Sequence, residues 1–579
     1  MWKWILILTI SCLCVHEVTA QSSEELEIIM RFTGCDSPEQ MDEHEVERLC
    51  HYIEHPVRIN VMSLSALRSS GLFSAYQAAS LIDYRVRHGD VMSLNELAAV
   101  DGFNHETVNT LAPFISFAGG EVGWNAPVLS NDLALKGGVS FKSGNPSGGY
   151  AIKYKSEIEG RMSAAVAASR SADEVWGPPD LYSGHLSWEM KKIPARLIFG
   201  DFNARFGQGL ALWNGFSMSG LGKTSSFMKS SSGLSSSWSF TGGSALTGVA
   251  GEMSLSGMRI SALVSLPNVR YNGLSEATIL PAMNIAWFAR HMTMSLTHYM
   301  EFVPPSDNMR SYVPDMKTSA DVAMCIKGVD LFSEIAFDWV NLTSAALAGI
   351  VFPCSEEVRM AAHIRYYPSA YNPSRSAAIR SGSKCTNEYS VSFCSDYTQR
   401  SGRQNCSVAL DASYRPMPKM GTDLNLQLKL LADYTLTVND FFQMKFRFSE
   451  RFRTWDKPYR TDMRTDVSLT WSRFILATRL NVLQCVGTGL LGYLEGGYKT
   501  ERLSFYLRFG IYRIDNWDDR IYVYERDAPG NFTVPAFYGR GAWASLSAVW
   551  RYARWGRLYS RITIKPGKAE LKLQSVFSF

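Results

Sequence analysis

The chain has 579 residues, of which 46% are hydrophobic, 12% aromatic and 19% charged, and its formal net charge is +4. After the first residues no run of about 18 consecutive apolar residues occurs, which excludes a bundle of transmembrane helices. A mean hydropathy of -0.09 combined with frequent aromatic residues suits strands whose apolar and polar sides average to near zero.

Residues 1–20 have the pattern of a secretory signal peptide. Lys3 precedes a short apolar stretch, and the residues expected before a cleavage site end at Ala20. Cys12 raises the alternative of a lipoprotein signal, but the three residues before it match such a signal poorly. We therefore predict export, with cleavage after Ala20.

Residues 21–117 are predicted to form a helical domain with a strong negative charge. Apolar residues recur at three-to-four spacing among acidic ones from Glu24 to Ile53, and Pro56 ends this part. From Gln21 to Gly120, fifteen acidic residues stand against six basic ones, a net charge of −9; the rest must carry +13 to give +4 overall. Opposite charges favour docking of the helical domain on the rest of the chain.

A repeat of about 30 residues follows Pro56, and each unit combines a short helix, a glycine-centred turn and a second helix. The turns are Gly71-Leu72-Phe73 and Gly102-Phe103-Asn104. They either bind phosphate through backbone N–H groups or form left-handed turns between packed helices. We favour the second interpretation, because Phe73 and Asn104 replace the second glycine that close phosphate approach requires. The expected core residues are Leu64, Leu67, Leu72, Ile82, Leu94, Leu97, Phe103, Leu111 and Phe114.

From about Gly120 onward, apolar and polar residues alternate with the period of two that is typical of strands, for example over residues 150–158 and 503–511. Strands of about 9–11 residues plus turns divide residues 121–579 into roughly 14 to 18 antiparallel strands. We therefore predict an α+β multidomain chain, a small all-α domain followed by a large antiparallel transmembrane β-barrel over 121–579. Such an interior is wider than its own side chains can fill, unless loops plug it.

The C-terminal residues form a strand with one apolar side. Leu571, Leu573, Phe577 and Phe579 share a face, and Lys572 lies opposite. A terminal aromatic of this kind resembles the C-terminal signal by which outer-membrane barrels are recognised for insertion. We predict that Phe577 and Phe579 are this signal and that the barrel assembly machinery is a partner. The alternative is a soluble domain that ends on an edge strand.

Two segments of the barrel region have the composition of long loops. Asn214 to Gly248 is rich in Ser and Gly with apolar residues interspersed, and it folds either into the lumen or outside the cell. We favour the lumen, because apolar residues are costly on a fully solvated loop. Lys384 to Gln404 is predicted to be a long external loop tied by disulfides.

Eight cysteines remain after cleavage, and an exported chain can form disulfides. Cys35 with Cys50, and a pairing among Cys385, Cys394 and Cys406, are the candidate local links; connectivity stays open. Neither C-x-x-C pairs nor histidines at ligand spacing accompany these cysteines, so we expect no metal site.

Two polar segments are candidates for a site in the lumen, namely residues 199–210 and 518–527. One interpretation is a luminal site that binds a substrate or holds a plug. The other, which we favour, is a ladder of ion pairs that makes the barrel wall rigid. Catalytic triads, phosphate loops, and zinc or calcium signatures are missing from the sequence, so we expect neither an enzyme nor a cofactor. The candidate residues are Asp201, Asn203, Arg205, Gln208, Asp519, Arg520, Tyr522, Tyr524, Glu525 and Arg526.

Taken together, several segments resemble one family. They are the acidic helical start, residues 56–60 and 93–97, the run 200–210, Asn387-Glu388 and the run 520–541. The chain is similar over nearly its whole mature length to the helix-hairpin-helix domain-containing outer-membrane β-barrel proteins of Bacteroidota. The repeat by itself resembles the helix-hairpin-helix motifs of competence-type DNA-uptake proteins.

The resemblance implies an outer-membrane barrel surrounded by lipid, with residues 21–117 in the periplasm. We expect a subunit of an envelope assembly, export or transport complex, with protein partners in the outer membrane or periplasm and the helical domain as a docking or plug module. The alternative is a conduit for DNA or another substrate. DNA is disfavoured, because the acidic helical domain would repel a polyanion.

Overall fold

The structure is a computed structural model that describes residues 23–33, 35, 38–41, 43–103, 105–118, 129–142, 145–158, 161–170, 177–190, 194–215, 221–238, 245–255, 257–267, 278–289, 291–303, 313–418, 425–439, 441–531 and 533–579. The predicted signal peptide and Asn104 lie outside these residues. No helix of the described part is long and apolar enough to cross a membrane.

Residues 23–118 form a helical domain, as the apolar spacing predicted. Serines begin its helices: Ser63, Ser74 and Ser93 each accept a hydrogen bond from the backbone N–H three residues on, and Gln77 completes a capping box with Ser74. The elements are α2 (Ser23–Thr33), η1 (Pro38–Gln40), α3 (Glu43–Glu54), β1 (Val57–Arg58), α4 (Leu64–Ser69), α5 (Ala75–His88), α6 (Leu94–Ala98), α7 (His105–Leu111), η2 (Ala112–Phe114) and β2 (Ile115–Ser116).

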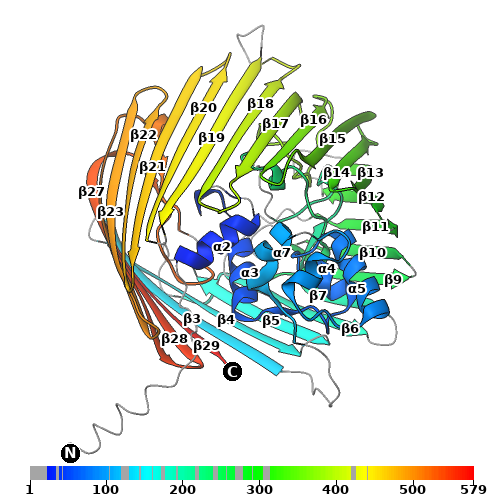
Figure 1. The fold of residues 1–579 in the computed structure, drawn as a ribbon, viewed down its shortest axis with the longest axis horizontal. Helices are drawn as coiled ribbons and strands as arrows, with labels where there is room; N and C mark the ends of the chain where they lie inside the picture. Colours follow the sequence, from blue (N-terminus) through cyan, green and yellow to red (C-terminus); the bar gives the residue numbers. More distant parts are fainter. Residues whose placement is uncertain are drawn as a thin grey trace, which may run out of the picture.

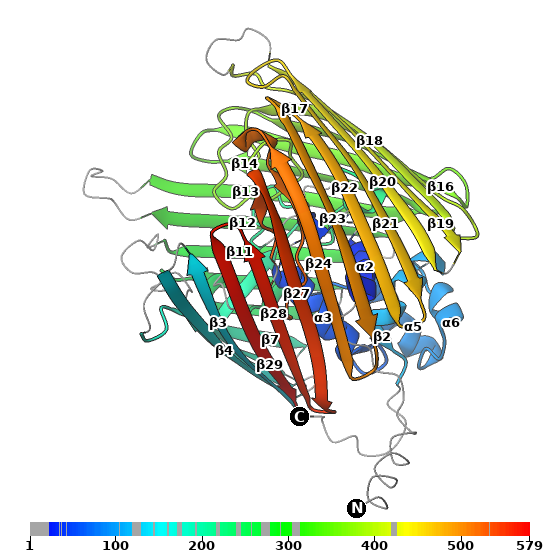
Figure 2. The same ribbon diagram turned by 90° about the vertical axis from the view of Figure 1, so that its left-hand side faces the viewer.

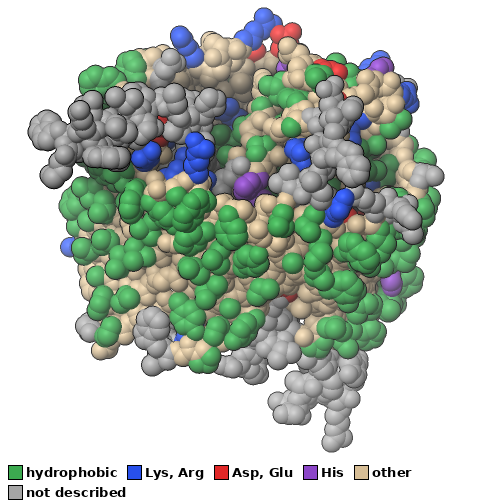
Figure 3. Space-filling view, turned by 90° about the horizontal axis from the view of Figure 1, so that it is seen from below, with side chains coloured by type: hydrophobic (Ala, Val, Ile, Leu, Met, Phe, Trp, Pro, Cys, Tyr) green, Lys and Arg blue, Asp and Glu red, His purple; other side chains and the backbone are tan. Residues whose placement is uncertain are grey.

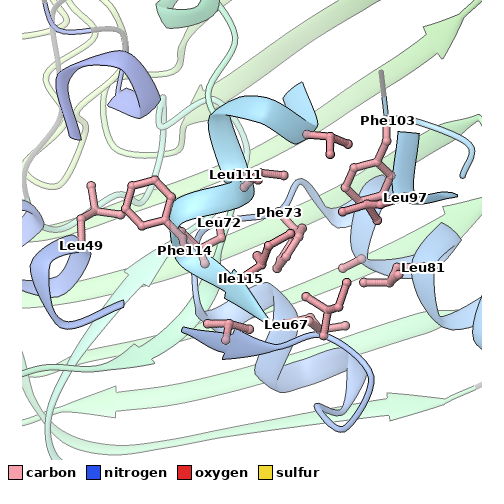
Figure 4. Packing of buried hydrophobic residues seen from close by; sticks show 14 of the residues in the cluster. Leu49, Leu67, Leu72, Phe73, Leu81, Leu97, Phe103, Leu111, Phe114 and Ile115 are labelled. Carbon is pink, nitrogen blue, oxygen red and sulfur yellow. The ribbon is translucent and has the colours of Figure 1, made fainter. Parts of the chain in front are cut away.

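The hydrophobic residues of the repeat form one core (Figure 4). Phe73 and Phe103 come from the two glycine-centred turns and meet edge to face, with ring centroids 6.2 Å apart. Leu67, Leu72 and Leu97 are buried in the same cluster, and the other predicted core residues are buried or packed against it. Asn60 ties the repeat together, since its side-chain amide donates to the Val91 carbonyl at 2.8 Å.

Residues 129–578 form a closed antiparallel barrel of 24 strands (Figure 1). Every wall strand pairs with its sequence neighbour, and β29 closes the ring on β3, from Lys568 opposite Lys142 to Ser578 opposite Asp132. The short β8 pairs with the end of β7, but β7 also pairs directly with β9, so β8 is not one of the 24 strands of the ring. The strands are β3 (Leu129–Lys142), β4 (Asn145–Ile158), β5 (Met162–Arg170), β6 (Leu181–Met190), β7 (Ala195–Arg205), β8 (Gly233–Ser236), β9 (Leu246–Leu255), β10 (Met258–Ser265), β11 (Leu280–Ala289), β12 (Met292–Val303), β13 (Val313–Ile326), β14 (Val329–Asp338), β15 (Thr343–Pro353), β16 (Val358–Tyr367), β17 (Glu388–Thr398), β18 (Gln404–Tyr414), β19 (Leu426–Asn439), β20 (Phe442–Arg453), β21 (Tyr459–Trp471), β22 (Phe474–Gln484), β23 (Thr488–Lys499), β24 (Leu503–Ile514), β27 (Gly539–Ala553), β28 (Gly556–Lys565) and β29 (Lys568–Ser578).

The predicted number of 14 to 18 strands was wrong. Many hairpin connections are much shorter than we allowed for: β13 ends at Ile326 and β14 begins at Val329, while β21 ends at Trp471 and β22 begins at Phe474. Such two-residue turns need few residues, so the same length of chain forms more strands.

The outer wall is apolar because inward and outward residues alternate along each strand. On β24, Leu507, Phe509 and Ile511 are exposed on the outside, whereas Ser504 and Arg508 are buried inside. Hydrophobic side chains spread over the wall, and Lys and Arg side chains gather toward the upper part of the view (Figure 3).

The two rims of the barrel differ. We call the rim at Ser578 the near rim; there the connections are short, as between β13 and β14. At the opposite, far rim lie three long connections, residues 206–245, 368–387 and 515–538. Figures 1 and 2 show that the helical domain lies within the ring, with α2 and α3 behind the wall strands and α5 and α6 toward one end.

The long connections fold into the lumen. Leu210, Phe227 and Ile379 are buried against inward residues of β14 to β18, and Phe227 packs on His363 of β16 with ring centroids 5.5 Å apart. Residues 221–228 of the segment Asn214 to Gly248 thus lie in the lumen, as favoured, whereas Leu246 to Gly248 begin the wall strand β9. β25 (Ile521–Tyr522) and β26 (Ala536–Phe537) pair within the third connection and pack on Trp543.

The prediction of an external loop from Lys384 to Gln404 was wrong. Most of this segment is β17 and the start of β18. Cys394 faces the lumen and is fully buried, whereas Cys406 has the outward orientation of its neighbour Val408. Cys394 and Cys406 therefore lie on opposite faces of the wall and cannot form a disulfide with each other. Cys385 and Cys406 are free thiols in the structure. Cys35 and Cys50 lie in the core of the helical domain, and their pairing stays a prediction.

Candidate functional site

The helical domain contacts the inner wall of the barrel through ion pairs. Glu39 at η1 lies 3.0 Å from Arg464 of β21 and 2.6 Å from Arg479 of β22. Glu45 of α3 lies 3.6 Å from Arg205 at the end of β7. Because these strands lie on different sides of the ring, the domain is held across the lumen.

The electrostatics of these contacts keep the acids charged. Burial by itself would raise the pKa of Glu39, but Arg479, Arg464 and their hydrogen bonds hold it well below its ordinary value. Burial likewise opposes ionisation of Glu45, while Arg48 and Arg205 lower its pKa. The acidic domain and the basic barrel are thus complementary at identified pairs, as the opposite net charges predicted.

Glu39 also joins the helical domain to a loop from the far rim. The backbone N–H of Tyr524 donates to Glu39 Oε1 at 3.1 Å. Tyr524 belongs to the inward connection 515–538, which is anchored to the wall by Glu495 through Arg526 at 2.8 Å. The helical domain, this loop and the wall are therefore connected inside the barrel.

A less favourable contact lies near the near rim, where α4 meets β9 to β11. Arg68 is 1% exposed, and none of its three guanidinium nitrogens has a hydrogen-bond partner in the described part of the chain. Its guanidinium lies 3.6 Å from the centroid of the Phe288 ring. Burial and the neighbouring Arg259 lower the pKa of Arg68 to about 9. This contact buries positive charge with weak compensation.

The first polar segment, on β7, serves mainly to fasten the wall and its loops. Asp201 is fully buried and accepts hydrogen bonds from the Ser183 hydroxyl at 2.6 Å, the Gly184 N–H at 2.8 Å and the Thr247 hydroxyl at 2.8 Å. Asn203 accepts from the Asn214 side-chain amide at 3.0 Å.

Hydrogen bonds also anchor the loop after β7 to the wall. The Gln208 and Leu210 N–H groups donate to Glu334 of β14 at 2.7 and 3.0 Å. The first segment thus anchors loops and, through Arg205, the helical domain.

The second segment divides into two parts. Asp519 is buried and accepts from the Cys485, Val486 and Gly487 N–H groups at 2.8 to 3.1 Å, which fixes the loop on the β22–β23 turn. Glu525 pairs with Lys565 at 3.0 Å. Arg520 and Tyr522 instead form a partly exposed pair, with Arg520 Nε donating to the Tyr522 hydroxyl at 2.8 Å. The structure does not join the two predicted segments into one cluster; the helical domain lies between them.

The glycine turns are occupied by the protein's own groups. Gly71 and Gly102 have φ of +68° and +85°, the left-handed conformation of the favoured interpretation. The Gly71 N–H donates to the Arg68 carbonyl at 3.0 Å, and a Cβ there would overlap the Arg48 guanidinium. A Cβ at Gly102 would lie 2.6 Å from the Tyr76 ring. Phosphate would therefore compete with side chains that already cover both turns.

One group of side chains that sequence reasoning missed could hold a metal ion. His51 of α3, His55 directly after α3 and Asp132 of β3 bring their ligand atoms within 4.8 Å of one another. The spacing of four residues on one helix face was the available signal. Lys155 opposes a cation here, because its ammonium lies 3.1 Å from His51 Nε2. Glu39, Arg464 and Arg479 were also missed, because single charges carry no signal before the fold brings them together.

The C-terminal strand has the predicted two faces. Leu571 and Leu573 are exposed on the outside, whereas Gln574 is buried inside. Phe577 stacks on Trp555 with ring centroids 6.0 Å apart, and the Phe579 N–H donates to the Asn131 carbonyl at 2.9 Å. Recognition of Phe577 and Phe579 for insertion stays a prediction.

A scan against protein-family models and a search of curated proteins found no match. Among solved structures the chain is similar to the P pilus usher (PapC) translocation pore, with 10% identity, a TM-score of 0.34, and coverage of 78% of this chain and 99% of that one. It is similar to the copper transporter OprC, with 8% identity, a TM-score of 0.42, and coverage of 78% and 80%. It is also similar to the siderophore receptor PirA from Pseudomonas aeruginosa, with 8% identity, a TM-score of 0.40, and coverage of 78% of this chain and 80% of that one. At these scores the likenesses carry no functional argument.

Proposed function

We propose that the protein is an outer-membrane barrel for transport or export whose lumen is closed by its own helical domain. A closed barrel leaves no unpaired strand edge, and an apolar outer wall suits a lipid bilayer. Outer-membrane barrels have short periplasmic turns and longer external loops. The near rim has short turns, so we assign the near rim and the helical domain to the periplasmic side.

The observation that carries the proposal is the placement of Glu39. This carboxylate of the helical domain is paired with Arg464 and Arg479 of the wall and accepts from Tyr524 of an inward loop. A domain held at this depth obstructs passage. Transport would then require these pairs to open, so the domain acts as a plug rather than as a permanent filler.

The test is ion conductance of the full-length protein in planar bilayers. We expect low conductance for the wild type. The variant Arg464→Glu/Arg479→Glu should show at least roughly tenfold more channel openings than the wild type, because removing one partner of a buried charge pair costs about 2–5 kcal/mol. Adding Glu39→Arg to this variant restores opposite charges between the helical domain and the wall, while Asp466 of the wall keeps two acidic neighbours. Conductance should therefore return part of the way to the wild-type level.

The triple variant serves as the control for general damage to the barrel. If the double variant conducts no more than the wild type, the pairs do not hold a plug. If the triple variant stays as open as the double variant, the effect comes from the wall and not from its contact with Glu39.

A second role, as a subunit that docks a protein partner, is favoured by the exposure of two apolar side chains. Val86 of α5 and Met92 before α6 are 81% and 72% exposed. Purification in mild detergent, with quantification of co-eluting proteins, tests this role. A stoichiometric partner that is lost from Val86→Asp/Met92→Asp would support docking, and a barrel that elutes alone would argue against it.

A further inference from the structure

The outer face of β24 and β27 carries two arginines at the far rim. On β24 the exposed outward residues alternate from Leu503 to Ile511, and Arg513 continues this row with 63% of its side chain exposed. On β27, Arg540 is exposed and lies directly opposite Arg513 in the strand register. The two strands run side by side on the face that Figure 2 shows. Both guanidinium groups therefore belong to the side of the wall that faces away from the lumen.

These arginines mark one end of an apolar band. The outward residues of β24 between Leu503 and Arg513 are apolar, and Ala542, Leu546 and Trp550 continue the band on β27. The steps from Leu503 to Arg513 rise about 24–28 Å on a strand tilted by about 35–45°. The apolar band of outer-membrane barrels is about 25 Å tall. The arginines thus lie at the level where hydrocarbon gives way to headgroups.

Other strands carry aromatic residues at this level. On β16, β17 and β18 the outward positions at the far rim are Tyr366, Tyr389 and Tyr414, and the first two rings stack with centroids 4.7 Å apart. Such residues form the aromatic belt that outer-membrane barrels place at the interface. On β24 and β27 this belt is interrupted by positive charge.

The protein neutralises the arginine pair only weakly. Directly opposite residues have Cβ atoms about 4.5–5.5 Å apart, and like charges there destabilise a sheet. Arg513 lies 3.9 Å from Asp515, and an exposed ion pair of this kind contributes little. Asp518, further along the connection, pairs with Lys457 at 2.5 Å. Arg540 forms no hydrogen bond or ion pair with the described residues. The pair therefore keeps a net positive charge toward the headgroups.

Two exposed aromatic side chains lie at the same end of these strands. Trp517 follows β24 and Tyr538 directly precedes β27, and their rings meet edge to face with centroids 4.9 Å apart. They are 55% and 58% exposed, whereas Phe537 beside them is buried in the lumen. At the headgroup level such rings combine an apolar face with a polar tip, which suits contact with the sugar of a lipid headgroup.

We propose that Arg513 and Arg540 bind the phosphate monoester of an anionic glycolipid of the outer leaflet, with Trp517 and Tyr538 against its sugar. A phosphate monoester carries up to about two negative charges and three acceptor oxygens. One such group can therefore accept hydrogen bonds from both guanidinium groups, and its binding removes the repulsion between them. This inference rests on the proposed function, from which the assignment of the far rim to the outer leaflet comes.

Native mass spectrometry of the full-length protein in detergent, titrated with lipid A at one fixed salt concentration, tests the site. Diphosphorylated lipid A is compared with its phosphate-free form. We expect the wild type to bind the phosphorylated form at least roughly tenfold more tightly, because charge-assisted hydrogen bonds to phosphate are the strong ones. Arg513→Gln/Arg540→Gln should lose this preference. Arg513→Lys/Arg540→Lys should keep part of it, because lysine retains the charge but not the bidentate fork.

Arg473→Gln is the matched control, since Arg473 is an exposed arginine on the near-rim turn between β21 and β22. This variant should keep the wild-type preference. Equal binding of the two lipids by the wild type would overturn the proposal. A full preference in Arg513→Gln/Arg540→Gln, or its loss in Arg473→Gln, would do the same. The wild-type comparison involves no substitution, so a double variant that fails to fold does not affect it.

Two competitors distinguish the glycolipid from other sources of phosphate. Inorganic phosphate lacks the sugar and acyl chains, and phosphatidylglycerol offers a diester with a single charge, so both should displace lipid A only weakly. Displacement by either one at the concentration of lipid A would contradict the assignment to a glycolipid. Binding in detergent needs no opening of the plug. A negative titration therefore leaves the conductance result standing, and unchanged conductance leaves the lipid site standing.

Discussion

Arg68 and Glu39 both extend from the helical domain to the inner wall of the barrel, and their surroundings differ. Glu39 meets two arginines and a backbone N–H. Arg68 meets the Phe288 ring and a second buried arginine, Arg259. A buried charge is stabilised only when its partners and hydrogen bonds offset the loss of water. The two residues therefore act oppositely on the docked state: Glu39 holds the domain and Arg68 weakens its contact.

Replacing Arg68 by Met should stabilise the protein. The substitution removes a buried charge that the Phe288 ring and Glu252 compensate only weakly, and it supplies an unbranched apolar side chain. Replacing buried ionic groups by well-packed apolar residues stabilises proteins by about 1–4 kcal/mol. The thermal midpoint of the detergent-solubilised protein measures the effect. Arg87→Met, at an exposed ion pair with Asp83, is the control and should leave the midpoint nearly unchanged. A lower midpoint for Arg68→Met would mean that this arginine has a partner that stabilises it.

At the scale of elements, the contact between η1 and strands β21 and β22 depends on ionisation of Glu39. Its pKa in the docked state lies well below the ordinary value of 4.5. A group with a depressed pKa stabilises the docked state above its undocked pKa, and this stabilisation is lost as the pH falls toward the docked pKa. The contact should hold at neutral pH and weaken only in acid.

We therefore expect conductance of the wild-type protein to stay low from about pH 8 to 5 and to rise as the pH falls below about 4.5. Glu39→Gln should already be more open at neutral pH and should lose this rise. Planar-bilayer recordings over the pH range measure both. A rise of the same size in Glu39→Gln would assign the acid response to another group.

At the scale of the whole molecule, the barrel forms a closed ring, and the helical domain and three inward connections lie inside it. The wall is stabilised by backbone pairing around the ring and by its apolar outside. Inside the ring, apolar clusters such as that of Leu210 and Phe227 are accompanied by carboxylates that accept backbone N–H groups, as Glu334 and Asp519 do. Lipid contact and lumen contact are thus separated onto alternate residues of every strand.

Leu507→Arg, outward at the middle of β24, should impair membrane insertion or stability. Arginine on the lipid face costs about 2–4 kcal/mol at the bilayer midplane and about 0–1 kcal/mol near its edges. Leu503→Arg is the control, because it places the same substitution on the same face at the start of the strand, where the cost should be small. Urea unfolding in lipid vesicles measures both free energies. Equal costs at the two positions would mean that this face does not meet the bilayer core.

The sequence by itself determined the two-part architecture, the faces of the strands and the core of the helical repeat. Each follows from local periodicity: the alternation at residues 503–511 and the spacing around Leu67 and Leu97 depend only on neighbours along the chain. Opposite net charges also indicated that the two parts dock.

Only the tertiary structure decided which charges meet and how many strands the wall has. The number of strands depends on the length of the turns between them. Turn length depends on local backbone geometry, which the alternation of apolar and polar residues does not reveal. Cys394 and Cys406 are close in sequence but lie on opposite faces of the wall. Glu39 lies more than 400 residues from Arg464 along the chain. These contacts arise from ring closure and docking, which no local pattern encodes.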